Sequence, residues 1–171
     1  RASDLIRSFK MVAADQVSGT RRIFNVHEYI DEVLLSLRPK LKKTTHKVEV
    51  VCDPELVVES YPGAISQILT NLIVNSLTHA FEDHQSGLMR IVVSAEQTTM
   101  CLTFSDNGRG IPSAMQTKIF EPFYTTARSQ GSTGLGLHIV FNIVTSTLKG
   151  TINFCSTPET GTTFQICIPI N

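Results

Sequence analysis

The sequence has no excess of charge of either sign, because 15 lysine and arginine residues balance 15 aspartate and glutamate residues. A basic groove for nucleic acid and a basic surface for acidic membranes are therefore not favoured. No signal peptide is visible in this sequence, and no apolar run approaches the roughly 20 residues that span a bilayer. What remains is a 171-residue globular chain, 42% hydrophobic and 18% charged, able to bury a core.

Cysteine is sparse, and the four present show no metal-binding or redox spacing. They are Cys52, Cys101, Cys155 and Cys167, each within an apolar, strand-like run. We interpret them as reduced thiols in or near the core of a cytoplasmic protein, in preference to disulfides.

Residues 1–17 have helical periodicity, with Leu5, Phe9 and Val12 on one stripe, and Gly19 ends the pattern. Because the chain starts inside this pattern, we expect a piece of a longer protein, which can itself be membrane-attached. Residues 18–22 are typical of a linker. We therefore divide the chain into residues 1–20, the end of a helical bundle or coiled coil outside the compact domain, and residues 21–171, that domain.

Helices and strands are mixed in the rest of the chain without βαβ regularity. Asn25 and Glu28 have the spacing of a capping box, which predicts a helix that Pro39 stops at about Arg38. Further helices are expected over residues 62–80, 113–118 and 135–148. Strands are expected over residues 48–52, 56–58, 90–96, 100–105, 151–156 and 162–168. The pattern predicts an α/β two-layer sandwich, with one mixed sheet covered on one face by helices.

Asn71 and Asn75 are four residues apart on a predicted helix, so their side chains share one face. Amide carbonyls are oxygen ligands suited to Mg²⁺. Two solvated asparagines would have the same spacing, and the pair alone does not separate these alternatives.

The run from Asp106 to Gly110 directly follows a predicted strand. A buried carboxylate there can accept a hydrogen bond from an exocyclic amine such as that of adenine, and two glycines let the backbone approach a flat ligand. An ordinary Asp-Asn-Gly turn is the competing interpretation.

The glycine-rich run 131–137 opens a predicted helix but contains no Gly-Lys-Ser/Thr, which excludes the common phosphate loop. Its free N–H groups at Thr133 to Gly136 can face phosphate oxygens. Just before it, Phe120 and Phe123 are expected to anchor a loop. Arg128 in that loop is either a contact to the terminal phosphate or a solvated arginine.

Taken in order, these clusters resemble the N, G1, F, G2 and G3 boxes of the two-component sensor histidine kinases, within the Bergerat-fold (GHKL) ATPase superfamily. The resemblance covers residues from about 22 to 169. It implies a Bergerat ATP-binding fold that binds ATP and Mg²⁺ and transfers the γ-phosphoryl group to a histidine on a separate helical hairpin.

By this resemblance Asn75 is the metal-linked residue, with Asn71 as its polar neighbour, and Asp106 reads adenine with support from Thr162. His79 falls where the family often has an aromatic or basic side chain. Asn71, Asn75 and Arg128 are the predicted catalytic residues. The further predicted nucleotide contacts are His79, Asp106, Gly108, Gly110, Ile111, Thr125, Thr126, Ser132, Thr133, Gly134, Leu135, Gly136, Leu137 and Thr162.

The resemblance also predicts partners. Residues 1–17 resemble the tail of the phosphoacceptor hairpin. The His27-Glu28 pair lacks a proline before Pro39, so we reject it as the phosphoacceptor. We expect the acceptor hairpin of the same or a sister chain, a downstream response regulator, and a dimer in the intact kinase, with no nucleic acid.

Two other functions compete. Relatives that hydrolyse ATP need a base one turn before the metal asparagine, and Asn71 cannot take a proton. An imidazole acceptor already has a lone pair, so Asn71 favours transfer to histidine over hydrolysis. A module that only senses nucleotide is the third alternative, left open by the absence of lysine from the loop at 124–133.

Overall fold

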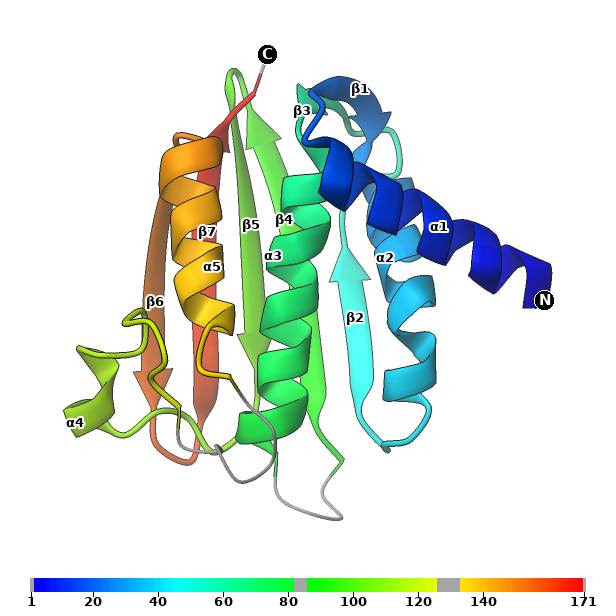
Figure 1. Cartoon of the computed structure of the whole chain (residues 1–171). Coiled ribbons are helices and arrows are strands. Elements are labelled where there is room, and N and C mark those ends of the chain that lie inside the picture. Colours follow the sequence, from blue (N-terminus) through cyan, green and yellow to red (C-terminus); the bar gives the residue numbers. More distant parts are fainter. Residues whose placement is uncertain (1, 82–85, 126–132, 171) are drawn as a thin grey trace.

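The computed structural model describes residues 2–81, 86–125 and 133–170 and contains a five-stranded mixed sheet (Figure 1). Its order is β2-β4-β5-β7-β6, in which β2 and β4 are parallel and the other neighbours antiparallel. The strands are β2 (Lys47–Val51), β4 (Leu88–Glu96), β5 (Thr99–Asp106), β6 (Thr151–Thr157) and β7 (Gly161–Pro169).

Helices cover one face of this sheet, as predicted (Figure 1). The layer consists of α2 (Val26–Leu41), α3 (Pro62–Asn75) and α5 (Gly136–Asn142), while α1 (Ala2–Ser18) packs on α2 and α3 and the short α4 (Ser113–Gln116) lies beyond the β6 edge of the sheet. One π-helical turn extends α3 (η1, Ser76–Ala80) and another extends α5 (η3, Ile143–Thr147). Among the described residues no helix is both long enough and apolar enough to cross a membrane.

The alternation along β5 shows why only one face is covered. Met100, Leu102 and Phe104 are buried beneath the helices, whereas Cys101 and Thr103 point to the opposite face and are only partly buried. Successive strand side chains point to opposite faces, so this pattern places the core between sheet and helices.

A second, two-stranded sheet was not predicted. Strand β1 (Arg22–Asn25) pairs antiparallel with β3 (Val57–Ser60). The sequence interpretation began the linker at residue 18 and ended it at Arg22, where β1 starts. A four-residue strand is too short to show a period of its own, and its partner lies more than 30 residues away.

Helix α2 begins as predicted and ends later than predicted. The Asn25 side chain accepts a hydrogen bond from the Glu28 N–H at 2.9 Å, as in a capping box. The prediction that Pro39 stops the helix is wrong, since α2 continues to Leu41. In a last turn, proline removes one intrahelical hydrogen bond and interrupts little helix beyond it.

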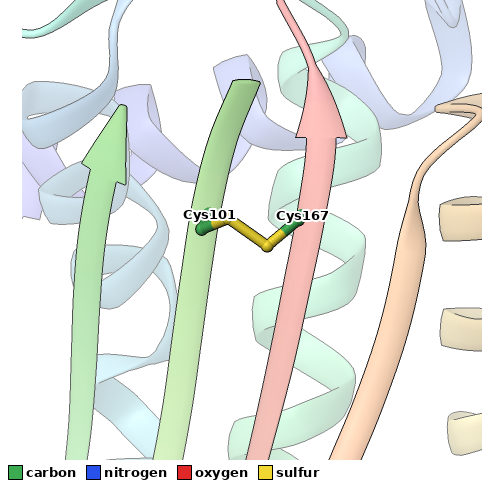
Figure 2. The surroundings of a disulfide bond; sticks show 2 residues. All are labelled: Cys101 and Cys167. Atoms are coloured by element: carbon green, nitrogen blue, oxygen red, sulfur yellow. A yellow bond between two sulfur atoms is a disulfide. The ribbon is translucent and has the colours of Figure 1, made fainter. Parts of the chain in front are cut away.

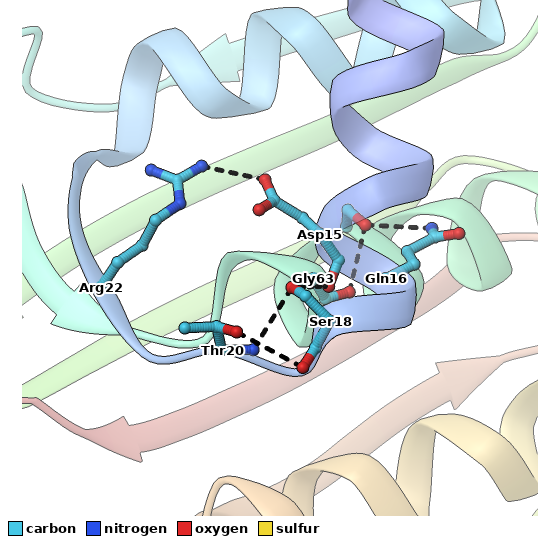
Figure 3. A network of polar contacts seen from close by, with 7 residues as sticks. Asp15, Gln16, Ser18, Thr20, Arg22 and Gly63 are labelled. Carbon is cyan, nitrogen blue, oxygen red and sulfur yellow. Dashed lines mark hydrogen bonds and ion pairs between the residues drawn. The ribbon is translucent and has the colours of Figure 1, made fainter.

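The last turns of α1 pack on the domain instead of standing apart from it (Figure 3). Asp15 accepts from the Arg22 guanidinium at 2.9 Å, and Gln16 donates to the Ser66 hydroxyl at 3.0 Å. Gly63 at the start of α3 lies so close to the Asp15 carbonyl that no side chain would fit there. The division of the chain at residue 20 stays a prediction.

The prediction of four reduced thiols is wrong for one pair, because Cys101 and Cys167 form a disulfide (Figure 2). They face each other in the β5–β7 register, with Cα atoms 4.1 Å apart. Cys52 and Cys155 are free. Local spacing could not reveal the bond, because the strand pairing joins residues 66 positions apart. The pair also lies on the face without helices, not in the core.

Candidate functional site

A cavity of about 770 Å³ lies beside the point where β5 ends and β7 begins. The end of α3, the turn η1, the loop after β5 and the segment leading into α5 border it. The predicted residues that line it are Asn71, Asn75, His79, Asp106, Gly110, Ile111, Thr125, Thr133, Gly134, Leu135, Gly136, Leu137 and Thr162. Thr126, Arg128 and Ser132 lie outside the described residues.

Asp106 is the acidic centre at one end of the cavity. Its Oδ2 accepts from the Ser76 hydroxyl at 2.9 Å, and its Oδ1 accepts from the Gly108 N–H at 3.0 Å. Burial raises the pKa of this carboxyl above its ordinary value, and hydrogen bonds from Gly108, Ser76 and the Thr162 backbone oppose the rise. These donors hold the carboxylate in place while leaving lone pairs for a ligand.

Gly108 is not among the described residues that line the cavity, and its predicted contact with nucleotide stays a prediction. A Cβ on Gly108 would collide with the Ala80 carbonyl, and the Gly108 N–H donates to Asp106. Gly108 therefore lets the loop after β5 pack closely against the backbone of Ala80.

Gly110 and Gly134 are both required by their backbone conformations. Their φ angles are +69° and +68°, in the left-handed region that side chains disfavour. A Cβ on Gly110 would collide with the Thr157 carbonyl, and one on Gly134 with the backbone of Phe123. Both glycines thus let loop segments close tightly around the cavity.

The two asparagines meet the start of α5 at another part of the cavity. A Cβ built on Gly136 would lie 3.0 Å from the Asn75 Oδ1 and 3.5 Å from the Asn71 Oδ1. The Asn71 amide donates to the Gln67 carbonyl at 2.9 Å. With its Nδ2 held by the helix backbone, Asn71 offers its oxygen on the side of Gly136.

His79 lines the cavity from the turn η1. Burial lowers the pKa of this imidazole, and the nearby Arg109 charge lowers it further. The ring is therefore held toward its neutral form, which suits contact with a flat ligand better than pairing with an anion.

Several residues at the site were missed by sequence reasoning. Ser76, Arg109, Gln116 and Ser156 form its hydrogen bonds and charge environment. Ser76 directly follows Asn75, but adjacent helical positions point to different faces, so the spacing of Asn71 and Asn75 does not indicate it. Ser156 and Gln116 act through strand pairing and loop closure, which leave no local signal.

The two phenylalanines that are predicted to anchor the loop differ in exposure. Phe120 packs against Phe141 and Phe154, with ring centroids 5.3 and 5.7 Å apart. Phe123 is 63% exposed and has a φ of 66°, and its backbone packs against Gly134.

The described residues contain no group of three or more histidine, cysteine, aspartate or glutamate side chains that could hold a metal ion. The asparagine oxygens are neutral donors. They fit Mg²⁺ only as a minor part of its shell, with phosphate and water oxygens supplying the rest.

Residues 61–171 match the family described as histidine kinase-, DNA gyrase B-, and HSP90-like ATPase. The match covers more than half of the chain, and the chain belongs to this family.

Among individual proteins, the chain is similar to kinases, including a sensor histidine kinase. The chain is 29% identical over 167 residues to sporulation kinase A of Bacillus subtilis (strain 168), covering 96% of this chain and 26% of that kinase. It is 33% identical over 114 residues to sensor histidine kinase ZraS of Escherichia coli (strain K12), covering 67% of this chain and 23% of ZraS. The chain thus spans about a quarter of the length of these curated relatives.

Among solved structures, the catalytic domain of histidine kinase ThkA matches with a TM-score of 0.75 and 30% identity. The match covers 88% of this chain and 95% of that domain. The predicted α/β fold is therefore confirmed.

Proposed function

We propose that this chain is the ATP-binding catalytic domain of a sensor histidine kinase, which transfers the γ-phosphoryl group of ATP to a histidine on a separate helical hairpin. The single observation that carries the proposal is the cavity that joins a held carboxylate, Asp106, to the paired amides of Asn71 and Asn75. One end suits an amine-bearing base and the other a metal-bound triphosphate.

Asp106 would accept from the exocyclic amine of adenine, since both of its oxygens are already oriented by donors. Ile111 and Leu137 contribute apolar lining for the base. Such a mixture of apolar walls and a few fixed polar groups is typical of cofactor sites.

At the phosphate end, Asn75 would supply one oxygen to Mg²⁺, and Mg²⁺ would offset the charge of the triphosphate. Thr133 to Gly136, in the segment leading into α5, line the cavity, and their N–H groups would be available to phosphate oxygens. Phosphoryl transfer depends mainly on positioning and on stabilising charge, so a site without a strong base suffices. Arg128 and the neighbouring loop residues Thr126 and Ser132 stay predictions.

Hydrolysis is less favoured than transfer. The carboxylates lining the cavity in the described residues are Asp106 and Glu159. Asp106 is engaged by two donors at the base end, and the amide Asn71 cannot accept a proton from water. A neutral imidazole needs no such base.

The partners follow from the same proposal. The acceptor hairpin belongs to the same or a sister chain, and residues 1–20 form the end of that hairpin. A response regulator would receive the phosphoryl group. ThkA has been solved in complex with the response regulator protein TrrA, which supports this part of the proposal.

The test is a transfer assay with radiolabelled ATP, Mg²⁺ and a supplied hairpin carrying an acceptor histidine. We expect an acid-labile, alkali-stable phosphoprotein. Asn75→Ala should lose transfer while keeping its melting temperature, whereas Asn153→Ala, on the exposed sheet face, should retain both. Tight ATP binding without any transfer would contradict the kinase function. Rapid phosphate release without an acceptor would instead support an ATPase.

A further inference from the structure

Ser156, at the end of β6, lies at the centre of a hydrogen-bond network that borders the cavity without lining it. Its Oγ accepts from the Ile111 N–H at 2.8 Å. The same oxygen lies 3.1 Å from the Gly161 carbonyl oxygen and 2.9 Å from the Thr162 hydroxyl. Three neighbours therefore share one serine hydroxyl.

Counting protons fixes the direction of these bonds. A serine hydroxyl has one proton and two lone pairs. One lone pair takes the Ile111 N–H, and the Gly161 carbonyl can only accept. All three contacts are satisfied together only when Ser156 donates to Gly161 and Thr162 donates to Ser156.

The Thr162 hydroxyl then has no proton left for the cavity that it lines, and a ligand meets only its lone pairs. Thr162 is also the register partner of Asp106, another acceptor at the same end. The acceptors on the two strands would accept hydrogen bonds from an amino group of a ligand. A carbonyl oxygen in the same place would repel them, because it has only lone pairs to offer.

We propose that Ser156 is a positioning residue that fixes the Thr162 hydroxyl as an acceptor, and so makes the base end of the cavity select a 6-amino purine over a 6-oxo purine. This inference rests on the proposed nucleotide function and assigns part of its selectivity to a side chain outside the cavity.

Gln116 provides a comparison within the same network. Its Nε2 donates to the Ile111 carbonyl at 2.9 Å and to the Ser156 carbonyl at 3.0 Å. It therefore holds the loop after β5 against β6, as Ser156 does, but has no bond to the Thr162 hydroxyl. Loss of Gln116 disturbs the position of the loop without freeing the proton of Thr162.

The experiment measures dissociation constants of ATP and inosine triphosphate by calorimetry, because these nucleotides differ at the 6-position of the base. Ser156→Ala frees the Thr162 proton to face the ligand. We expect it to reduce the preference for ATP by about tenfold, the size of one hydrogen-bond mismatch. Ser156→Thr keeps the hydroxyl and should retain the preference. Gln116→Ala should weaken the binding of ATP and of inosine triphosphate by a similar factor.

A second variant covers the case in which Ser156→Ala does not fold. Thr162→Val removes the hydroxyl itself and should lower the ATP preference, and adding Ser156→Ala to it should change the preference no further. Unchanged preference in Ser156→Ala, or in Thr162→Val when the serine variant does not fold, would overturn the inference. Failure of the unmodified chain to bind ATP would instead overturn the proposed function.

Discussion

Reduction of the Cys101–Cys167 disulfide should destabilise the domain substantially. The bond joins residues 66 positions apart, so it restricts the unfolded chain much more than the folded sheet, where β5 and β7 are already paired. The chain-entropy relation for a loop of this length gives about 4 kcal/mol of unfolding free energy. For a domain of this size, that corresponds to a fall of roughly 8–16 °C in melting temperature.

The assay is thermal unfolding followed by circular dichroism, with and without a phosphine reductant. Cys101→Ser combined with Cys167→Ser should reproduce the effect of the reductant and abolish any further response to it. Cys52→Ser and Cys155→Ser, at the free cysteines, serve as matched controls and should respond like the unmodified chain. Thiol titration of the denatured, unreduced chain should find the two free cysteines alone. Four reactive thiols would contradict the presence of the disulfide, and coincident melting curves would contradict its contribution to stability.

Three further predictions concern the site and its surroundings. Asp106→Asn should keep or raise the melting temperature, because burial disfavours the charged carboxylate. The same variant should lose ATP binding. Fluorimetric melts with and without ATP measure the stability and the binding. Gly136→Ala should lower ATP affinity by about tenfold, because the new Cβ would lie 3.0 Å from the Asn75 amide. It should not lower stability, because alanine favours a helix more than glycine does. Calorimetry measures the affinity and a thermal melt measures the stability. Burial lowers the pKa of His46, whose neutral Nδ1 accepts from the Gly87 N–H, so the unfolded state binds more protons below pH 6.5. Stability should therefore fall as pH drops through that window, and less so in His46→Gln, as urea titrations at several pH values would show.

Local chemistry explains what could be predicted from the sequence. The capping box at Asn25 depends on residues three apart, and its hydrogen bond is present in the structure. The residues from Asp106 to Gly110 combine a strand end with two glycines. Gly110 adopts a left-handed backbone conformation that glycine favours, so this turn could be expected from the local sequence. Asn71 and Asn75 share a face because a helix has a fixed period. Each of these features is contained within a few neighbouring positions.

Features that depend on distant pairing could not be predicted in this way. The Cys101–Cys167 bond and the β1–β3 sheet arise from strand neighbours far apart in the chain. The hydrogen bond from the Ile111 N–H to the Ser156 hydroxyl forms because β6 ends beside the loop that contains Ile111. The late end of α2 beyond Pro39 shows a different limit, since the cost of proline depends on how much helix follows it.

We infer that the cavity beside Asp106 binds ATP. Calorimetric titration of the purified chain with ATP and Mg²⁺, alongside the Asp106→Ala variant, tests this claim most directly. We expect saturable one-to-one binding by the unmodified chain and no binding by the variant, with both remaining folded by circular dichroism. Equal ATP affinity in the two proteins, or no binding by the unmodified chain, would contradict it.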